Sequence, residues 1–145
     1  MQKEAKVLQI IAPSKPEWRD LPVLDPQEGE VLVKVNAITT CPHWDLHIID
    51  GEPMFPNMKM EYPYTPGQPG HEMVGEVAAL GPGVEGFSIG DRVAAWQDRG
   101  LQVRQGCYAQ YVPFATKSLL KVPEHMPDEK VASLELAMCV QVTFD

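Results

Sequence analysis

The sequence predicts a mainly β fold, an irregular and partly open barrel with short helices, and three observations support this prediction. Residues 30–38 alternate in polarity with the two-residue period of a strand, which places Val31, Val33 and Val35 on one face. Further short apolar runs are separated by turns that contain glycine. Fourteen prolines and eleven glycines in 145 residues indicate many turns, and hence mostly strands rather than helices.

The first half of the chain is expected to hold two strands and a long irregular segment. Residues 7–12 are a short apolar run that predicts a first or edge strand. Prolines between residues 13 and 26 argue against a central strand there, because proline has no amide hydrogen to donate across a sheet. The strand 30–38 follows. Six prolines between residues 39 and 70 then exclude long elements, although residues 44–49 are compatible with one helical turn.

The irregular segment is longer than most loops of compact domains, and loops of that length are usually functional. Its part from residue 50 to residue 64 is rich in Met, Phe and Tyr. These apolar side chains either pack the segment onto the barrel or line an apolar substrate pocket. The sequence leaves both interpretations open.

The second half of the chain is expected to contain short strands and a final helix. The expected strands cover residues 71–80, 93–96, 107–112 and 119–122. A helix is expected to begin at Asp128, which can cap its N-terminus, and to continue through the apolar residues 131–140. No strand followed by Gly-x-Gly-x-x-Gly occurs, so we expect no dinucleotide-binding motif within residues 1–145.

Charge and composition narrow the classes of partner and compartment. A net charge of −8 argues against nucleic acid and anionic membranes as partners. The sequence has no run of about 18 apolar residues and no apolar signal-peptide core after Met1, so we expect no membrane-spanning helix and no secretion. Three cysteines far apart in the sequence suit a reducing compartment better than a disulfide framework. We therefore expect a cytoplasmic protein.

The most informative short motif is Gly70-His71-Glu72, at the start of an expected strand. A histidine binds zinc through a neutral ring nitrogen, and a glutamate beside it can act as a base or a transient ligand. Cys41 and Cys139, distant in the sequence, could complete a catalytic zinc site with one open position. The alternative for each cysteine is that it only packs as a small hydrophobic residue.

Several motifs, in their order along the chain, resemble those of zinc-dependent alcohol dehydrogenases of the medium-chain dehydrogenase/reductase superfamily. They are Gly29 to Val35, Cys41, Asp45-Leu46-His47, Gly70-His71-Glu72 and Gly90 to Val93. The similarity runs from about residue 7 to the last residue and covers the family's catalytic, GroES-like domain. It implies that residues 1–145 form a GroES-like catalytic domain, ending in the helix that would lead to a Rossmann domain that is missing here.

The resemblance implies a catalytic zinc held by Cys41, His71 and Cys139. In relatives these positions are the cysteine after the first long strand, the histidine of Gly-His-Glu and a cysteine near the domain junction. The segment Met138 to Phe144 resembles the junction motif of the yeast-type branch. The histidine is generally missing from the zinc-free quinone-reductase branch, so its presence favours the metal-binding branch.

The resemblance also assigns supporting roles around the metal. Glu72 corresponds to the glutamate beside the ligand histidine, Asp45 to the aspartate that orients this histidine, and His47 to a proton-relay histidine. The chain departs from the family in one spacing. Three residues separate Cys41 from Asp45, where relatives commonly have two, and no hydroxyl side chain follows the cysteine. A proton relay that runs through His43 is the alternative this departure suggests.

The implied activity is the interconversion of an alcohol and an aldehyde or ketone. Zinc would act as the Lewis acid, and NAD or NADP would be bound by the missing domain, so the chain alone is expected to be inactive. Only one zinc is expected, because residues 97–105 lack the four cysteines that hold a structural zinc in many relatives. The resemblance further implies a small-molecule substrate and a homo-oligomeric full-length protein.

Two other classes of function are compatible with the fold. A zinc-free, quinone-reductase-like member of the same superfamily would use the barrel only to shape a substrate pocket, and the altered spacing after Cys41 keeps this alternative open. A non-enzymatic GroES-like barrel would instead bind another protein. The Gly-His-Glu motif argues against the last class, because a binding module has no need of a histidine–glutamate pair at the mouth of a strand.

Overall fold

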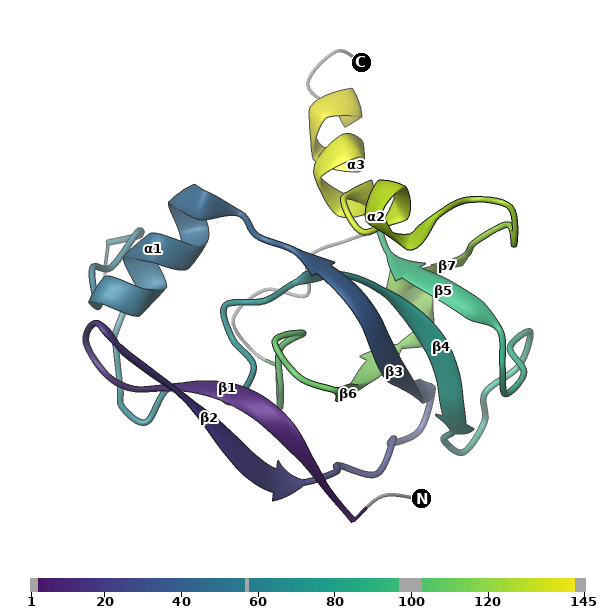
Figure 1. Ribbon diagram of the computed structural model, residues 1–145, viewed down its shortest axis with the longest axis horizontal. Helices are drawn as coiled ribbons and strands as arrows, with labels where there is room; N and C mark the ends of the chain where they lie inside the picture. Colours follow the sequence, from purple (N-terminus) through teal and green to yellow (C-terminus); the bar gives the residue numbers. More distant parts are fainter. Residues whose placement is uncertain (1–2, 57, 97–102, 143–145) are drawn as a thin grey trace.

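The main sheet is organised around β3 (Glu30–Thr39), the strand whose alternation is clearest in the sequence. The computed structural model describes residues 3–56, 58–96 and 103–142, and within them five antiparallel strands follow the order β6-β3-β4-β5-β7 (Figure 1). The other four strands are β4 (Glu72–Leu80), β5 (Arg92–Ala95), β6 (Tyr111–Ala115) and β7 (Leu119–Lys121). In the described residues β6 and β7 are not paired with each other, so the expected mainly β, partly open architecture is confirmed.

A separate two-stranded sheet pairs β1 (Glu4–Ala12) with β2 (Lys15–Pro22). Backbone hydrogen bonds join it to the rest of the molecule, among them the bond from the Leu8 amide to the Tyr108 carbonyl at 2.8 Å and the bond from the Gly67 amide to the Leu8 carbonyl at 2.7 Å. The prolines of residues 13–26 therefore lie in and around a strand that is paired on one side only, which their missing amide hydrogens allow. The prediction that no central strand occurs here is confirmed.

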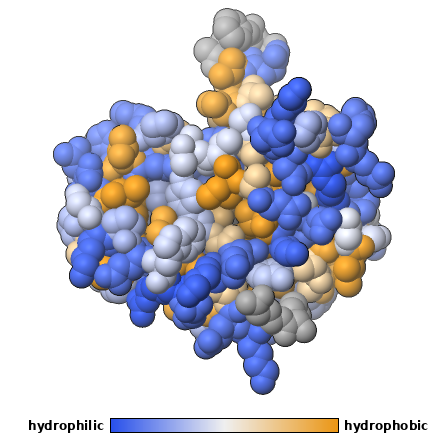
Figure 2. Space-filling view, viewed as in Figure 1, coloured by the Kyte–Doolittle hydropathy of each residue, from blue (hydrophilic) through white to orange (hydrophobic). Residues whose placement is uncertain are grey.

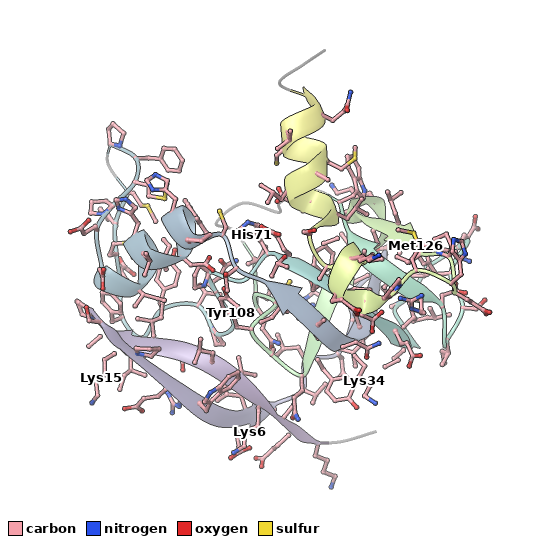
Figure 3. All side chains as sticks on the ribbon, turned by 45° about the horizontal axis from the view of Figure 1, so that its top comes forward. Lys6, Lys15, Lys34, His71, Tyr108 and Met126 are labelled. Carbon is pink, nitrogen blue, oxygen red and sulfur yellow. The ribbon has the colours of Figure 1, made fainter. Side chains whose placement is uncertain are left out.

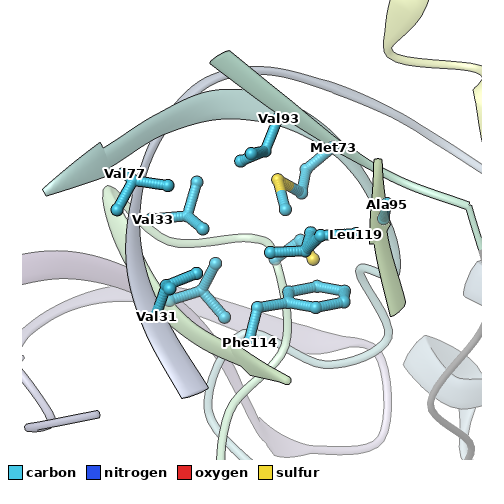
Figure 4. Close-up of a cluster of buried hydrophobic side chains, with 10 residues drawn as sticks. Val31, Val33, Met73, Val77, Val93, Ala95, Phe114 and Leu119 are labelled. Carbon is cyan, nitrogen blue, oxygen red and sulfur yellow. The ribbon is translucent and has the colours of Figure 1, made fainter. Parts of the chain in front are cut away.

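The hydrophobic core lies on the concave side of the main sheet (Figure 4). The alternating residues Val31 and Val33 of β3 are fully buried in it, together with Met73 and Val77 of β4. Phe114 of β6 closes the cluster from the other side of β3. Burying each of these side chains contributes roughly 1.5–3 kcal/mol, so the period-two pattern seen in the sequence is what holds the sheet together.

Helix α1 (Pro42–Asp50) has nine residues, about two and a half turns, and is therefore longer than the single turn predicted. The prediction assumed that every proline of this segment interrupts a helix. Pro42 does not, because it stands in the first turn, where the amide hydrogen that proline lacks has no partner within the helix. The helix ends at Gly51, whose φ of 77° is the left-handed conformation typical of a C-terminal cap.

Two helices follow the last strand, α2 (Asp128–Val131) and α3 (Leu134–Val142), and a 3-10 turn (Thr116–Ser118) joins β6 to β7. The helix start at Asp128 agrees with the prediction, but its role as the cap is wrong. Pro127 is the N-cap, and the Asp128 carboxylate pairs instead with the guanidinium of Arg92 on β5.

Helix α3 stands out from the body of the molecule in the space-filling view (Figure 2). Its side chains Leu136 and Val140 are about half exposed, at 50% and 49%. No helix among the described residues is both long and apolar enough to cross a lipid bilayer.

The strand predicted at residues 107–112 begins later, at Tyr111. The residues before it use their amides for other contacts. The Cys107 amide donates to the Gly70 carbonyl at 2.8 Å, and the Ala109 amide closes a tight turn onto the Cys107 carbonyl at 2.7 Å. Cys107 is therefore buried as an apolar residue would be, but in this turn and not in a strand.

This turn crosses the segment that leads into β4 at unusually short range. A Cβ on Gly106 would lie 2.2 Å from the carbonyl oxygen of Gly67, and a Cβ on Gly67 would lie 2.3 Å from that of Gly106. Only glycine permits two backbones to approach so closely. The Gly67–Gly106 crossing thus fixes residues 67–70, which place His71 at the start of β4.

Candidate metal centre

Strand pairing alone brings Cys41 and His71 together. Thr39, the last residue of β3, pairs with Glu72, the first residue of β4, so the residues just beyond each strand end are neighbours. One ligand atom each from Cys41, His71 and Glu72 lies within 4.8 Å of the others. Figure 3 shows His71 between the α1 side of the molecule and the base of α3. Two of the three predicted zinc ligands therefore meet, with Glu72 beside them.

The orientation of the His71 ring leaves one nitrogen available to a metal. Its Nδ1–H donates to the Pro69 carbonyl at 2.9 Å, so Nε2 is the ring nitrogen that faces the site. This Nε2 faces two carboxylate oxygens, Glu72 Oε1 at 3.7 Å and Glu135 Oε2 at 3.9 Å. A sulfur, an imidazole nitrogen and carboxylate oxygens are all ligand types that zinc accepts, so the donor set fits a metal ion.

Asp45 makes no hydrogen bond to the His71 ring among the described residues, and the orienting role expected for it stays a prediction. Its Oδ2 instead accepts hydrogen bonds from the Tyr108 hydroxyl and from the Cys41 amide, the latter at 3.2 Å. The carbonyl of Pro69 reaches the ring because it is only two residues away in the chain. Asp45 thus holds the backbone of a candidate ligand.

Burial sets the protonation of this Asp45–Tyr108 pair. Burial raises the pKa of Asp45 from its ordinary value, and the Tyr108 hydrogen bond offsets only part of that rise. Burial, reinforced by the Asp45 carboxylate, raises the pKa of Tyr108 far above the usual value of a phenol. The tyrosine therefore stays protonated and remains a hydrogen-bond donor.

Glu72 is 1% exposed, and a buried carboxylate needs partners. The Thr39 hydroxyl donates to Glu72 Oε2 at 2.5 Å from the adjacent strand. The same hydroxyl oxygen lies 3.1 Å from the carbonyl of Ala132, between α2 and α3. Thr39 thus ties the Glu72 carboxylate to the C-terminal helices.

Cys139, the third predicted ligand, is exposed on α3 and does not belong to the group of three donors. Its thiol donates to Glu135 Oε1 at 3.0 Å, one helical turn earlier. Glu135 is 5% exposed, and its other oxygen is the one that faces His71. Sequence reasoning missed Glu135. The available signals were an acidic residue within an apolar helical stretch and its i, i+4 spacing to Cys139.

The two histidines of α1 lie outside the group of three donors. Their rings contact edge to face with centroids 4.8 Å apart, and His43 is exposed. His47 is half-buried, and its Nδ1 lies 3.5 Å from Glu52 Oε2. The relay roles of both histidines remain predictions.

The long loop packs onto its neighbours, which agrees with the interpretation that its apolar side chains pack the segment onto the barrel. The Tyr64 amide donates to the Ile10 carbonyl of β1 at 2.8 Å, and the ring of Phe55 lies 6.1 Å from that of Trp44 on α1.

The expected absence of a structural zinc site concerns residues 97–105, and residues 97–102 lie outside the described part of the chain.

Residues 27–124 match the family model described as the alcohol dehydrogenase GroES-like domain. Alcohol dehydrogenase patD of Aspergillus clavatus is 34% identical over 86% of this chain and 34% of its own length. L-threonine 3-dehydrogenase of Proteus mirabilis is 28% identical over 78% of this chain and 38% of its own length. Among solved structures, the quinone oxidoreductase of Coxiella burnetii aligns with a TM-score of 0.77 and 26% identity, over 97% of this chain and 44% of that one.

The chain spans between about a third and under half of the length of each of these proteins. The family match covers most of the present chain, from the turn before β3 to the segment after β7. It therefore includes the three donors that meet at the mouth of β4. This chain belongs to the alcohol dehydrogenase GroES-like domain family of the medium-chain dehydrogenase/reductase superfamily.

Proposed function

We propose that this chain is the catalytic domain of a zinc-dependent oxidoreductase that interconverts a small alcohol and an aldehyde or ketone with NAD or NADP. The observation that carries the proposal is the convergence of Cys41, His71 and Glu72, with His71 Nε2 facing the Glu72 carboxylate. The dehydrogenases among the relatives support the reaction class. The dinucleotide is proposed to bind to a separate nucleotide-binding domain.

Cys41 and His71 would hold the zinc, with a third donor from α3, where Cys139 is the predicted residue. A bound zinc with an open position supplies Lewis acidity toward an alcohol or carbonyl oxygen. The other residues of the site would orient the ligands. The Pro69 carbonyl orients the His71 ring so that Nε2 faces the site, and Asp45 holds the Cys41 backbone.

Glu72 and the histidines of α1 are proposed to handle charge and protons. The Glu72 carboxylate, fixed by Thr39, lies close enough to Nε2 to compensate the charge of an ion there. His47 is proposed to pass a proton between the site and solvent, because its ring is half-buried and its Nδ1 lies 3.5 Å from Glu52 Oε2, an exposed carboxylate.

Metal analysis tests the proposal. Purified protein, saturated with zinc and freed of excess ion, is expected to retain one zinc per chain. Cys41→Ala and His71→Ala are expected to lose it, since each removes a ligand. His125→Ala is the matched control, because His125 is exposed, and it should retain the metal. A folded wild-type protein that retains no zinc would contradict the proposal.

One observation favours a second candidate, a zinc-free reductase. The quinone oxidoreductase of Coxiella burnetii aligns over nearly the whole chain. The three-residue spacing between Cys41 and Asp45 is also longer than the zinc-dependent pattern. This candidate predicts the opposite result in the metal analysis, together with full structural integrity of Cys41→Ala.

A further inference from the structure

We propose that α1 carries a second cation site, separate from the one around His71, in which His43, His47 and Glu52 bind a divalent transition metal ion such as zinc. The two histidines stand four residues apart on the helix, and Glu52 directly follows its C-terminal cap. Imidazole nitrogens with a carboxylate oxygen suit zinc, nickel or copper better than magnesium or calcium. This site uses none of the residues proposed to hold the catalytic ion, so it does not depend on the proposed function.

The first argument is the spacing of the two histidines. Residues four apart lie on the same face of a helix, and two histidines at this spacing bind zinc in helical metal sites. The rings of His43 and His47 lie with their centroids 4.8 Å apart. Two imidazoles that share one tetrahedral zinc, each bound at about 2.0–2.1 Å, place their centroids roughly 5 Å apart. Helix α1 thus holds the two rings at the separation that a shared ion requires.

The second argument is an unsatisfied nitrogen. His47 Nδ1 is shielded from solvent and has no hydrogen-bond partner among the described residues. Glu52 Oε2 lies 3.5 Å from it, which is longer than an N–H···O hydrogen bond. A nitrogen and an oxygen bound to one zinc stand roughly 3.3 Å apart, so the observed distance fits two ligands of one ion better than a donor and its acceptor. A bound ion would satisfy the nitrogen that the protein leaves without a partner.

The third argument is charge and access. Helix α1 contains no lysine or arginine that would repel a cation, and the C-terminal end of a helix favours positive charge. His43 and Glu52 are exposed, so an ion can reach them from solvent and both side chains can turn toward it. The three side chains are not gathered around one point as Cys41, His71 and Glu72 are. Ordering them costs binding energy, so the second ion should bind more weakly than the first.

Equilibrium dialysis against increasing concentrations of zinc tests the site. The wild type is expected to bind two zinc ions per chain, and the second should be lost when excess ion is removed. His43→Ala and Glu52→Gln should each lower the affinity for the second ion by at least about tenfold, because a lost ligand costs at least as much as a lost outer-shell partner. Both variants should bind the first ion unchanged. His43→Ala is expected to fold, since the residue is exposed on a helix and alanine has the highest helix propensity.

Matched controls separate this site from the catalytic one. His125→Ala and Glu129→Gln remove exposed side chains of the same types outside α1, and both should keep the second ion. Cys41→Ala should lose the tightly bound ion and keep the weaker one. Zinc should therefore raise the thermal unfolding temperature of Cys41→Ala, and adding His43→Ala should abolish this rise.

Two results would overturn this inference. One is a wild type that binds no zinc beyond the first ion, and the other is a His43→Ala or Glu52→Gln variant that binds the second ion as tightly as the controls do. A wild type that binds the weaker ion but not the tight one would instead contradict the proposed function and leave this inference intact.

Discussion

At the scale of single residues, the buried Glu72 carboxylate depends on one hydroxyl. Thr39 and Glu72 are paired across β3 and β4, so their side chains lie on the same face of the sheet. The 2.5 Å hydrogen bond from Thr39 satisfies one carboxylate oxygen that water does not reach. Removing the donor while keeping the carboxylate leaves a buried charge without its partner, which costs more than the bond itself contributes.

Thr39→Val is therefore expected to lower the free energy of unfolding by about 1–3 kcal/mol, since valine has the shape of threonine without the hydroxyl. Urea denaturation of the metal-free protein measures the loss. Thr39→Ser restores the donor and should recover most of the stability. Equal stability of the valine variant and the wild type would show that Glu72 does not need this bond.

At the scale of elements, a turn is fastened to the edge of the sheet by Asp91. Its Oδ2 accepts from the Ser88 amide at 2.7 Å, and the Lys121 ammonium of β7 lies 2.8 Å away. The Lys121 hydrogen bond, and after it the Ser88 amide, hold the pKa of Asp91 below its ordinary value of 3.8. The salt bridge between Asp91 and Lys121 thus joins the turn before β5 to the edge strand β7.

Asp91→Asn is expected to destabilise the protein at neutral pH, by an amount that depends on pH. A carboxylate whose folded pKa is lowered stabilises the fold above its unfolded pKa, and this contribution disappears as the pH falls through the folded value. The stability difference between wild type and variant should therefore be constant near pH 7 and shrink below pH 3.8. Urea denaturation across this range, repeated at high salt to screen the exposed pair, checks it. A difference independent of pH would contradict the assignment.

The Gly67–Gly106 crossing is the second feature at this scale. Gly106→Ala would place a methyl group 2.2 Å from a backbone oxygen. Overpacking of this kind typically costs about 1–3 kcal/mol, and backbone cannot yield as a flexible side chain can. We expect both lower stability and weaker zinc binding, because the displaced residues 67–70 carry His71. Thermal unfolding and zinc titration measure the two effects.

Gly86→Ala is the matched control for this crossing. Gly86 has a φ of 77°, and no atom lies within 4 Å of the position that a methyl group would occupy there, so alanine adds backbone strain of about 1–2 kcal/mol without crowding. Its zinc affinity should equal that of the wild type. If Gly106→Ala binds zinc as tightly as this control does, the crossing does not position His71.

At the scale of the whole molecule, the central strands and the open barrel were predictable because one face of each strand is buried. Val31, Val33 and Val35 recur with the two-residue period of a strand, and this pattern predicts both the strand and its core face, although the intervening Leu32 is apolar and buried as well. The late start of β6 was not predictable, because it depends on distant groups that satisfy the backbone, such as the Gly70 carbonyl that accepts from Cys107. The length of α1 was underestimated because Pro42 stands in the first turn, where it does not interrupt the helix.

The candidate site, like the fold, was predictable from the sequence only in part. Cys41 and His71 followed from motifs at strand ends, and strand pairing brings them together. The partner of His71 Nδ1 is the backbone carbonyl of Pro69. This partner could not be predicted, because every residue has a backbone carbonyl and the sequence does not show which one reaches the ring. The position of Glu135 was missed because the packing of α3 against the sheet brings its carboxylate to face His71, and one helical turn decides which side chain faces inward.

The donors around His71 belong to segments that meet only in the folded chain: the ends of β3 and β4, and α3 near the last described residue. An ion shared among them would act as a cross-link that closes two long loops at once. The entropy that the unfolded chain would lose in forming such loops makes capture of the ion and completion of the fold one cooperative event. The affinity of this protein for its metal would then be a measure of how firmly its last helix is held.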